Sequence, residues 1–164
     1  MNKVLQILSF LFLFIVSTTL AETLDFSDLV KRDGYYYKRF SDIPFTGNIN
    51  AQGFIFGRIE NGKKEGYWSY FHDNGQLMMK GFIKNDMNEG EWVKYHNNGK
   101  LNSKVFFIND KLEGPAVYYW SDGQLKSKGS WKNHKRDGVW VFFDGRGKDL
   151  KKSGTYLNGE KISN

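Results

Sequence analysis

Histidines are the first candidates for chemistry in this chain, because imidazole binds metal ions and transfers protons near neutral pH. There are three of them, His72, His96 and His134. If the chain folds into hairpins, one strand separates His72 from His96 and the two stand about 10 Å apart. Two ligands of one zinc ion must approach to about 4 Å. These histidines therefore predict no metal site, and His134 is expected in a turn.

Other side chains form no catalytic pattern either. The chain has no cysteine, which excludes a disulfide framework, a thiolate zinc site and a cysteine nucleophile. The glycines of the Asn-Gly pairs are dispersed singly and build no phosphate-binding loop. Acidic residues recur just before a glycine, which indicates turn chemistry rather than a carboxylate pair: they are Glu65, Glu89, Glu113 and Asp137. We therefore expect no enzyme, no cofactor and no metal.

These residues recur because the chain is built from copies of one unit of 24 residues. Two series of glycines mark the period: Gly66, Gly90, Gly114 and Gly138, and Gly75, Gly99, Gly123 and Gly147. A fixed period of this length predicts stacked supersecondary units. The copies cover residues 66–89, 90–113, 114–137 and 138–162, and residues 42–65 form a degenerate first copy. Residues 22–41 carry no repeat signature and are expected to cover the first edge strand, as a terminal unit must.

Two turn signals in each copy predict a β-hairpin. Asn74-Gly75 and Asn85-Asp86 accept positive φ, so each favours a two-residue loop of type I′. The resulting registers are Trp68 opposite Gly81, Tyr70 opposite Met79, His72 opposite Leu77, Met79 opposite Trp92 and Gly81 opposite Gly90. Both turns place the large apolar residues on one face, which supports the registers. The predicted fold is all-β, an elongated single-layer antiparallel β-meander of 24-residue hairpin repeats.

The alternation divides the side chains between two faces of the predicted sheet. One face carries a row of Trp68, Trp92, Ala116 and Trp140, with Gly81 and Gly129 expected beneath neighbouring tryptophan rings. The opposite face carries aromatic residues on one set of strands and lysines on the other. This candidate contact surface consists of Phe71, Tyr95, Tyr119, Phe143, Lys80, Lys104 and Lys128. The alternative is that the aromatic row only stabilises a sheet that has no second layer.

The first residues differ from the rest of the chain. Lys3 precedes an apolar run of about 12 residues, and Thr19-Leu20-Ala21 ends in small residues. This pattern predicts a signal peptide, residues 1–21, cleaved after Ala21. The alternative, an uncleaved anchor, would need roughly 20 apolar residues to cross a bilayer. An exported chain without disulfides fits a bacterial periplasmic or secreted protein.

The repeat motif resembles a known family. Gly66-Tyr67-Trp68, Phe71, Asn74-Gly75, Leu77 and Lys80-Gly81, with the turn Asn61-Gly62-Lys63-Lys64-Glu65-Gly66, are similar to the bacterial MORN-repeat variant family. The resemblance covers about residues 34–162. It implies a single-layer antiparallel sheet that contacts proteins or lipid surfaces, and some members are described as antitoxin-like. The chain departs from the motif at Val105, at Pro115-Ala116 and at Arg146-Gly147.

The sequence therefore predicts a non-enzymatic, exported repeat scaffold for protein or envelope-surface contacts. Two alternatives remain, which are peripheral binding to anionic lipid or glycan, and an antitoxin-like role as the neutralising partner of a toxin. The net charge is +6, but acidic and basic residues are interspersed, which argues against nucleic acid as a partner.

Overall fold

The computed structural model describes residues 21–147 and 150–164. The predicted signal peptide, apart from Ala21, lies outside the described residues. The strands are β1 (Thr23–Leu24), β2 (Leu29–Arg32), β3 (Tyr35–Lys38), β4 (Gly47–Ala51), β5 (Ile55–Glu60), β6 (Lys63–Phe71), β7 (Leu77–Lys84), β8 (Met87–Tyr95), β9 (Leu101–Ile108), β10 (Lys111–Leu112), β11 (Gly114–Tyr119), β12 (Leu125–Lys132), β13 (Lys135–Phe142), β14 (Gly154–Leu157) and β15 (Glu160–Ser163). The helical element of the described chain is one 3-10 turn, η1 (Phe26–Asp28).

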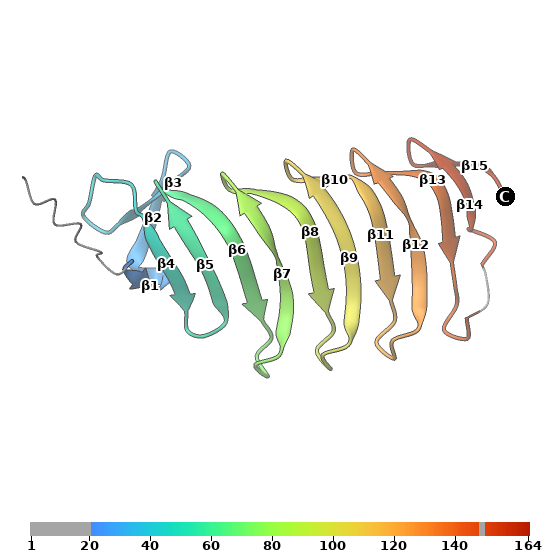
Figure 1. Cartoon of the computed structure of the whole chain (residues 1–164), viewed down its shortest axis with the longest axis horizontal. Helices are drawn as coiled ribbons and strands as arrows, with labels where there is room; N and C mark the ends of the chain where they lie inside the picture. The colour runs from blue at the N-terminus through green and yellow to red at the C-terminus, as the bar shows by residue number, and fades with distance from the viewer. Residues whose placement is uncertain (1–20, 148–149) are drawn as a thin grey trace, which may run out of the picture.

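The predicted all-β meander is confirmed. From β4 to β15 the strands follow one another in sequence order through a 13-stranded sheet, with β10 as a short extra strand on β9. Hairpin follows hairpin along the length of the molecule, from β4 at one end to β15 at the other (Figure 1). Neighbouring strands are antiparallel except for β1, which pairs in parallel with β4. The repeat period thus becomes a sheet that grows by two strands per copy.

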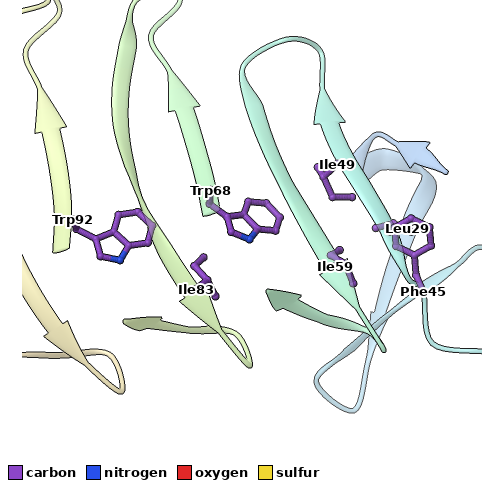
Figure 2. Packing of buried hydrophobic residues seen from close by; sticks show 7 residues of the cluster. All are labelled: Leu29, Phe45, Ile49, Ile59, Trp68, Ile83 and Trp92. Carbon is purple, nitrogen blue, oxygen red and sulfur yellow. The ribbon is translucent and has the colours of Figure 1, made fainter. Parts of the chain in front are cut away.

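The lead-in contacts the first long strand of the sheet, because β1 hydrogen-bonds to β4. It also packs on the tryptophan face, which the sequence did not predict. Strands β2 and β3 form a separate two-stranded sheet, and Leu29 packs in one cluster with Ile59 and Trp68. Figure 2 shows this ribbon beside the buried residues of β4 and β5. The lead-in therefore covers one end of the tryptophan face as well as the edge.

One predicted turn is confirmed and the other is wrong. Asn85 and Asp86 both have positive φ, 50° and 67°, between the paired residues Lys84 and Met87, so this is a two-residue type I′ loop. At the other tip the His72 N–H donates to Gln76 O, and Gly75 alone has positive φ. The loop has three residues, 73–75, and ends in a bulge glycine. An Asn-Gly pair also suits this loop, because only its glycine needs a left-handed conformation.

The predicted registers are correct along β6 and β7 and wrong where a bulge interrupts the pairing. Trp68 lies opposite Gly81 and Tyr70 opposite Met79, as predicted. The bulge at the three-residue tip pairs Leu77 with Phe71 instead of His72.

Between β7 and β8 the predicted pairs of Met79 with Trp92 and of Gly81 with Gly90 are wrong. Met79 lies opposite Lys94, and Lys80 opposite Val93. The register shifts because Gly81 faces the three residues 90–92, and Gly90 takes a φ of 72° there. The bulge adds two residues to β8, an even number, so the side chains on either side of it stay on the predicted face of the sheet.

This bulge explains the glycines beneath the tryptophans, a prediction that is confirmed. A Cβ on Gly81 would lie 2.2 Å from the Trp92 ring, and one on Gly129 would lie 2.2 Å from the Trp140 ring. Trp68 covers Gly57 in the same way, at 2.3 Å. Each ring therefore packs flat on the strand before its own, and no side chain larger than hydrogen fits beneath it.

The two departures from the motif at Val105 and Ala116 compensate for each other. Trp92 covers Gly81, 11 residues earlier, and in the next copy the same spacing joins Ala116 to Val105. Ala116 is buried and Val105 packs against it. A small residue replaces the ring where a larger residue replaces the glycine. The buried residues accordingly form two clusters, one ending at Trp92 and one beginning at Ala116, and Val105 contacts both.

Candidate interaction face

The predicted contact lysines lie in one continuous row across the face opposite the tryptophans. Directly opposed residues on successive strands form this row, called here the lysine row: Ser69, Lys80, Val93, Lys104, Val117, Lys128 and Val141. A lysine stands on every second strand, so neighbouring lysines are about 10 Å apart. A valine lies between each pair of lysines; Val93 is buried and Val117 is half-buried.

The lysines of this row are exposed and form no ion pair among the described residues. Lys80, Lys104 and Lys128 are all solvent-exposed. The ion pairs among residues 21–147 and 150–164 lie elsewhere. They join residues within the segment 22–42 to each other, or join Lys31 and Lys63 to Asp86 in the turn between β7 and β8. Three free ammonium groups at even spacing produce a positive stripe that attracts acidic partners and raises their association rate.

The predicted aromatic residues are less accessible than the lysines. Phe71, Tyr95, Tyr119 and Phe143 are each half-buried. Phe71 packs edge-on against Phe56, with ring centroids 5.5 Å apart. Both interpretations of this aromatic row therefore have support in its geometry, since the rings pack within the sheet and still present an edge to solvent.

A more exposed apolar row, absent from the sequence prediction, lies on the other side of the lysines. Tyr67 is 79% exposed, Phe106 38% and Val139 66%. Each lies two residues from a member of the lysine row on the same strand and so shares its face. The alternation that placed the lysines could have found these residues, because they occupy the next outward-facing position.

Two shallow depressions lie between the lysines and this apolar row. One, of about 320 Å³, is lined by Lys80 with Tyr67 and Phe82. The other, of about 200 Å³, is lined by Lys104 with Phe106 and Pro115. Glu91 borders both. Each depression thus joins an ammonium group and a carboxylate to an aromatic ring, and Glu89 adds a second carboxylate to the first depression.

His72 and His96 hydrogen-bond to the backbone of the next copy near the hairpin tips. His72 Nε2 lies 3.2 Å from Tyr95 O, and His96 Nε2 lies 3.1 Å from Tyr119 O. Each ring thereby connects one copy to the next. No group of three or more His, Asp or Glu in the described part of the chain is arranged to hold a metal ion.

The acidic residues before the glycines perform the predicted turn chemistry in three copies. Glu65 accepts a hydrogen bond from Asn85 N at 2.9 Å, and Glu89 accepts one from Asn109 N at 2.9 Å. Glu113 accepts one from Asn133 N at 2.8 Å. At the opposite tips the Asn74 amide donates to Asn97 O over 2.8 Å. Side-chain hydrogen bonds therefore connect neighbouring hairpins at both rows of turns, one on each side of the sheet.

Apart from Asp25 in the lead-in, whose pKa is lowered by the hydrogen bond from Ser27 N, the described titratable groups with perturbed pKa values lie on the tryptophan face. Burial lowers the pKa of the Lys64 ammonium, which Asp86 partly opposes. Burial raises the pKa of the Tyr70 hydroxyl. Burial also raises the pKa of Tyr118, although the hydrogen bond from Trp131 Nε1 acts the other way. The tryptophan face is thus the drier of the two.

Comparison with known proteins agrees with this architecture. The MORN repeat variant family matches three consecutive segments, residues 64–85, 88–109 and 112–133. Residues 64–133 are MORN repeats of the variant type. No curated protein matches the chain. The boundaries predicted for the first and last copies stay a prediction.

MORN repeats are a non-catalytic repeat family that generally binds proteins or membranes. Within residues 21–147 and 150–164, the structure contains no helix with the length and apolar character needed to cross a bilayer.

Proposed function

We propose that this protein is a non-enzymatic, exported repeat scaffold that binds an acidic protein partner through the lysine row and the apolar rows beside it. The observation that carries the proposal is the even row of Lys80, Lys104 and Lys128, exposed and without ion pairs among the described residues. Valines lie between the lysines, and Tyr67 and Phe106 lie beside them. Exposed rings supply rigid apolar contact area, and the lysines direct the approach of an acidic surface.

The lead-in also favours this face over the other. Phe26 of η1 stacks on Trp68 with ring centroids 5.9 Å apart, so the lead-in occupies one end of the tryptophan face. The lysine row lies on the opposite side of a single-layer sheet. A partner that recognises a linear array of acidic and apolar groups could contact several copies at once, and each further contact would add to the binding strength.

Charge reversal in the lysine row tests the proposal. The triple variant Lys80→Glu/Lys104→Glu/Lys128→Glu should lose the proteins that wild type crosslinks in the producing cell. The matched control makes the same charge change at the exposed hairpin tips, Lys84→Glu/Lys111→Glu/Lys132→Glu, and should keep those crosslinks. Equal capture by both variants would refute the lysine row as the contact surface.

Anionic lipid, glycan and a toxin are the alternative partners, and parallel measurements separate them from an acidic protein. Binding to vesicles of phosphatidylglycerol that falls steeply with salt, without any crosslinked protein, would favour lipid. Retention on an immobilised glycan would favour a carbohydrate partner. Capture of one toxic protein whose activity the scaffold suppresses would favour the antitoxin-like role.

Export is the other part of the proposal, and it rests on the apolar run that precedes Ala21. Protein recovered from the periplasm or culture medium of the producing cell should begin at Glu22 on N-terminal sequencing. Mature protein that still begins at Met1 would contradict cleavage after Ala21.

A further inference from the structure

The tryptophan row has a gap in its third copy. Trp68, Trp92 and Trp140 each cover a glycine of the preceding strand, but the third copy has Ala116 beside Val105. A ring at position 116 would lie over position 105, as Trp92 lies over Gly81. Val105 and Ala116 replace the glycine and the tryptophan of the other copies and keep the two strands in contact. The volume that the tryptophan ring would occupy above Val105 stays unfilled.

A groove of about 430 Å³ borders this gap at Val105. It extends from β6 to β9 on the tryptophan face, and its apolar wall consists of Tyr70, Met79, Ile83, Trp92, Val105 and Phe107. The Trp92 ring is fixed between its neighbours, with its centroid 6.4 Å from those of Tyr70 and Phe107. The groove is therefore preformed, and its size is that of a site for a small organic molecule.

The charged groups of the groove leave it net positive. Lys64 and Lys94 both line it. Its carboxylate, Asp86, already pairs with Lys63 at 3.4 Å and with Lys31 at 3.7 Å. Lys64 Nζ lies 4.7 Å from the Trp68 ring centroid and has no ion pair with a described residue. A half-buried ammonium group thus borders an apolar surface with no carboxylate bound to it.

We propose that this groove is a binding site for a small amphipathic organic acid, with a flat apolar body against Trp92 and Val105 and a carboxylate near Lys64. The apolar wall accounts for the body, since burial of such surface drives binding to preformed pockets. The Lys64 ammonium, which has no ion pair among the described residues, accounts for the anionic end, because a charge-assisted hydrogen bond to a carboxylate is about twice as strong as a neutral one. This site is on the opposite face from the proposed partner surface and does not depend on it.

Titration with phenylbutyrate tests the proposal. Spectra of isotope-labelled protein, residues 22–164, should show shifts of the Trp92 indole N–H and the Val105 methyl groups that saturate with ligand. The neutral amide of the same acid should bind about tenfold more weakly, and the corresponding amine more weakly still. No saturable shift at Trp92, or equal binding of acid and amine, would overturn the proposal.

Two variants locate the site. Lys64→Gln should weaken phenylbutyrate binding by about fivefold or more, whereas the matched change Lys132→Gln at an exposed hairpin tip should leave it unchanged. Val105→Gly/Ala116→Trp restores the motif and should place a ring in the Val105 end of the groove, so binding should weaken clearly while the thermal transition is kept. Undiminished binding by this folded double variant would place the ligand elsewhere and refute the site. If the double variant fails to fold, the Lys64→Gln comparison decides alone.

Discussion

At the residue scale, the contact of a tryptophan ring on a glycine holds the copies together. Trp68 and Trp140 are almost completely buried, and Trp92 is 8% exposed. Trp92 Nε1 donates to Phe82 O over 3.2 Å, and Trp140 Nε1 donates to Ser130 O over 2.8 Å. Each of these two rings thus buries its apolar area and satisfies its polar atom on the strand before it. Trp68 differs, since its Nε1 has no hydrogen-bond partner among the described residues.

Removal of one ring should destabilise the whole array. Trp92→Ala should lower the free energy of unfolding by about 3 kcal/mol or more, because it opens a cavity above Gly81 between Tyr70 and Phe107. Denaturant unfolding followed by circular dichroism measures the change. An unchanged transition would show that the tryptophan face is not the one that holds the sheet together.

Filling the space beneath a ring should be comparably harmful. A Cβ on Gly81 would lie 2.2 Å from the Trp92 ring, and overpacking of this kind costs about 1 to 3 kcal/mol. Gly145→Ala is the matched control, because a methyl group at that position would meet no atom within 4 Å. Gly81→Ala should therefore lower the melting temperature clearly and Gly145→Ala should not. Equal effects would mean that the ring can move aside.

The buried ammonium of Lys64 predicts a pH dependence of stability. Its pKa in the folded protein is lowered from 10.5 by burial, so the unfolded chain binds the proton more tightly. Stability should therefore rise, relative to Lys64→Met, as the pH increases from the folded pKa towards 10.5. Urea unfolding of both proteins at a series of pH values measures this difference. A difference that stays constant or falls over the series would contradict the assignment.

At the element scale, the hairpin tips decide the register between copies. The same hydrogen bond recurs in three successive copies. Glu65, Glu89 and Glu113 accept it from the backbone N–H of Asn85, Asn109 and Asn133, which lie in the next turn on the same side of the sheet. Glu89→Ala should cost about 1 kcal/mol, because it leaves Asn109 N without its acceptor. Glu91→Ala, an exposed neighbour on the same strand, is the control for thermal melting. Equal shifts for the two variants would show that the tip bond contributes little.

Much of the element structure could be predicted, and what escaped prediction has identifiable causes. The Asn85-Asp86 loop was predictable because both of its residues tolerate positive φ. The bulge at Gly90 was not, since glycine at this position is equally compatible with a regular strand. The partition of faces survived only because the bulge adds two residues rather than one.

The candidate site was predictable to a similar extent. Alternation along the strands placed Lys80, Lys104 and Lys128 on one face. It could not show that Tyr95 is half-buried while Tyr67 is largely exposed. Those differences depend on how neighbouring side chains lean across the sheet. The groove above Val105 depends on the same three-dimensional packing and on a contact between residues 11 positions apart.

At the scale of the whole molecule, each copy contacts mainly its neighbours, so the sheet should tolerate removal of one complete copy. Deletion of residues 66–89 joins Glu65 to Gly90. Trp92 then takes the place of Trp68 above Gly57 and beneath Phe26, and Asn109 supplies the N–H that Glu65 bonds in the intact chain. Every contact across the junction has a counterpart that the repeat already forms elsewhere.

The shortened protein should keep a β-sheet circular dichroism spectrum and a single cooperative melt. Its largest dimension in small-angle X-ray scattering should fall by about 10 Å, the width of two strands. Deletion of residues 66–77 is the matched control, since half a period reverses the direction of the following strands and leaves Gly57 without a covering ring. That variant should not fold cooperatively. If instead both deletions unfold the protein, the array is one indivisible unit, and the interchangeability of its copies is refuted.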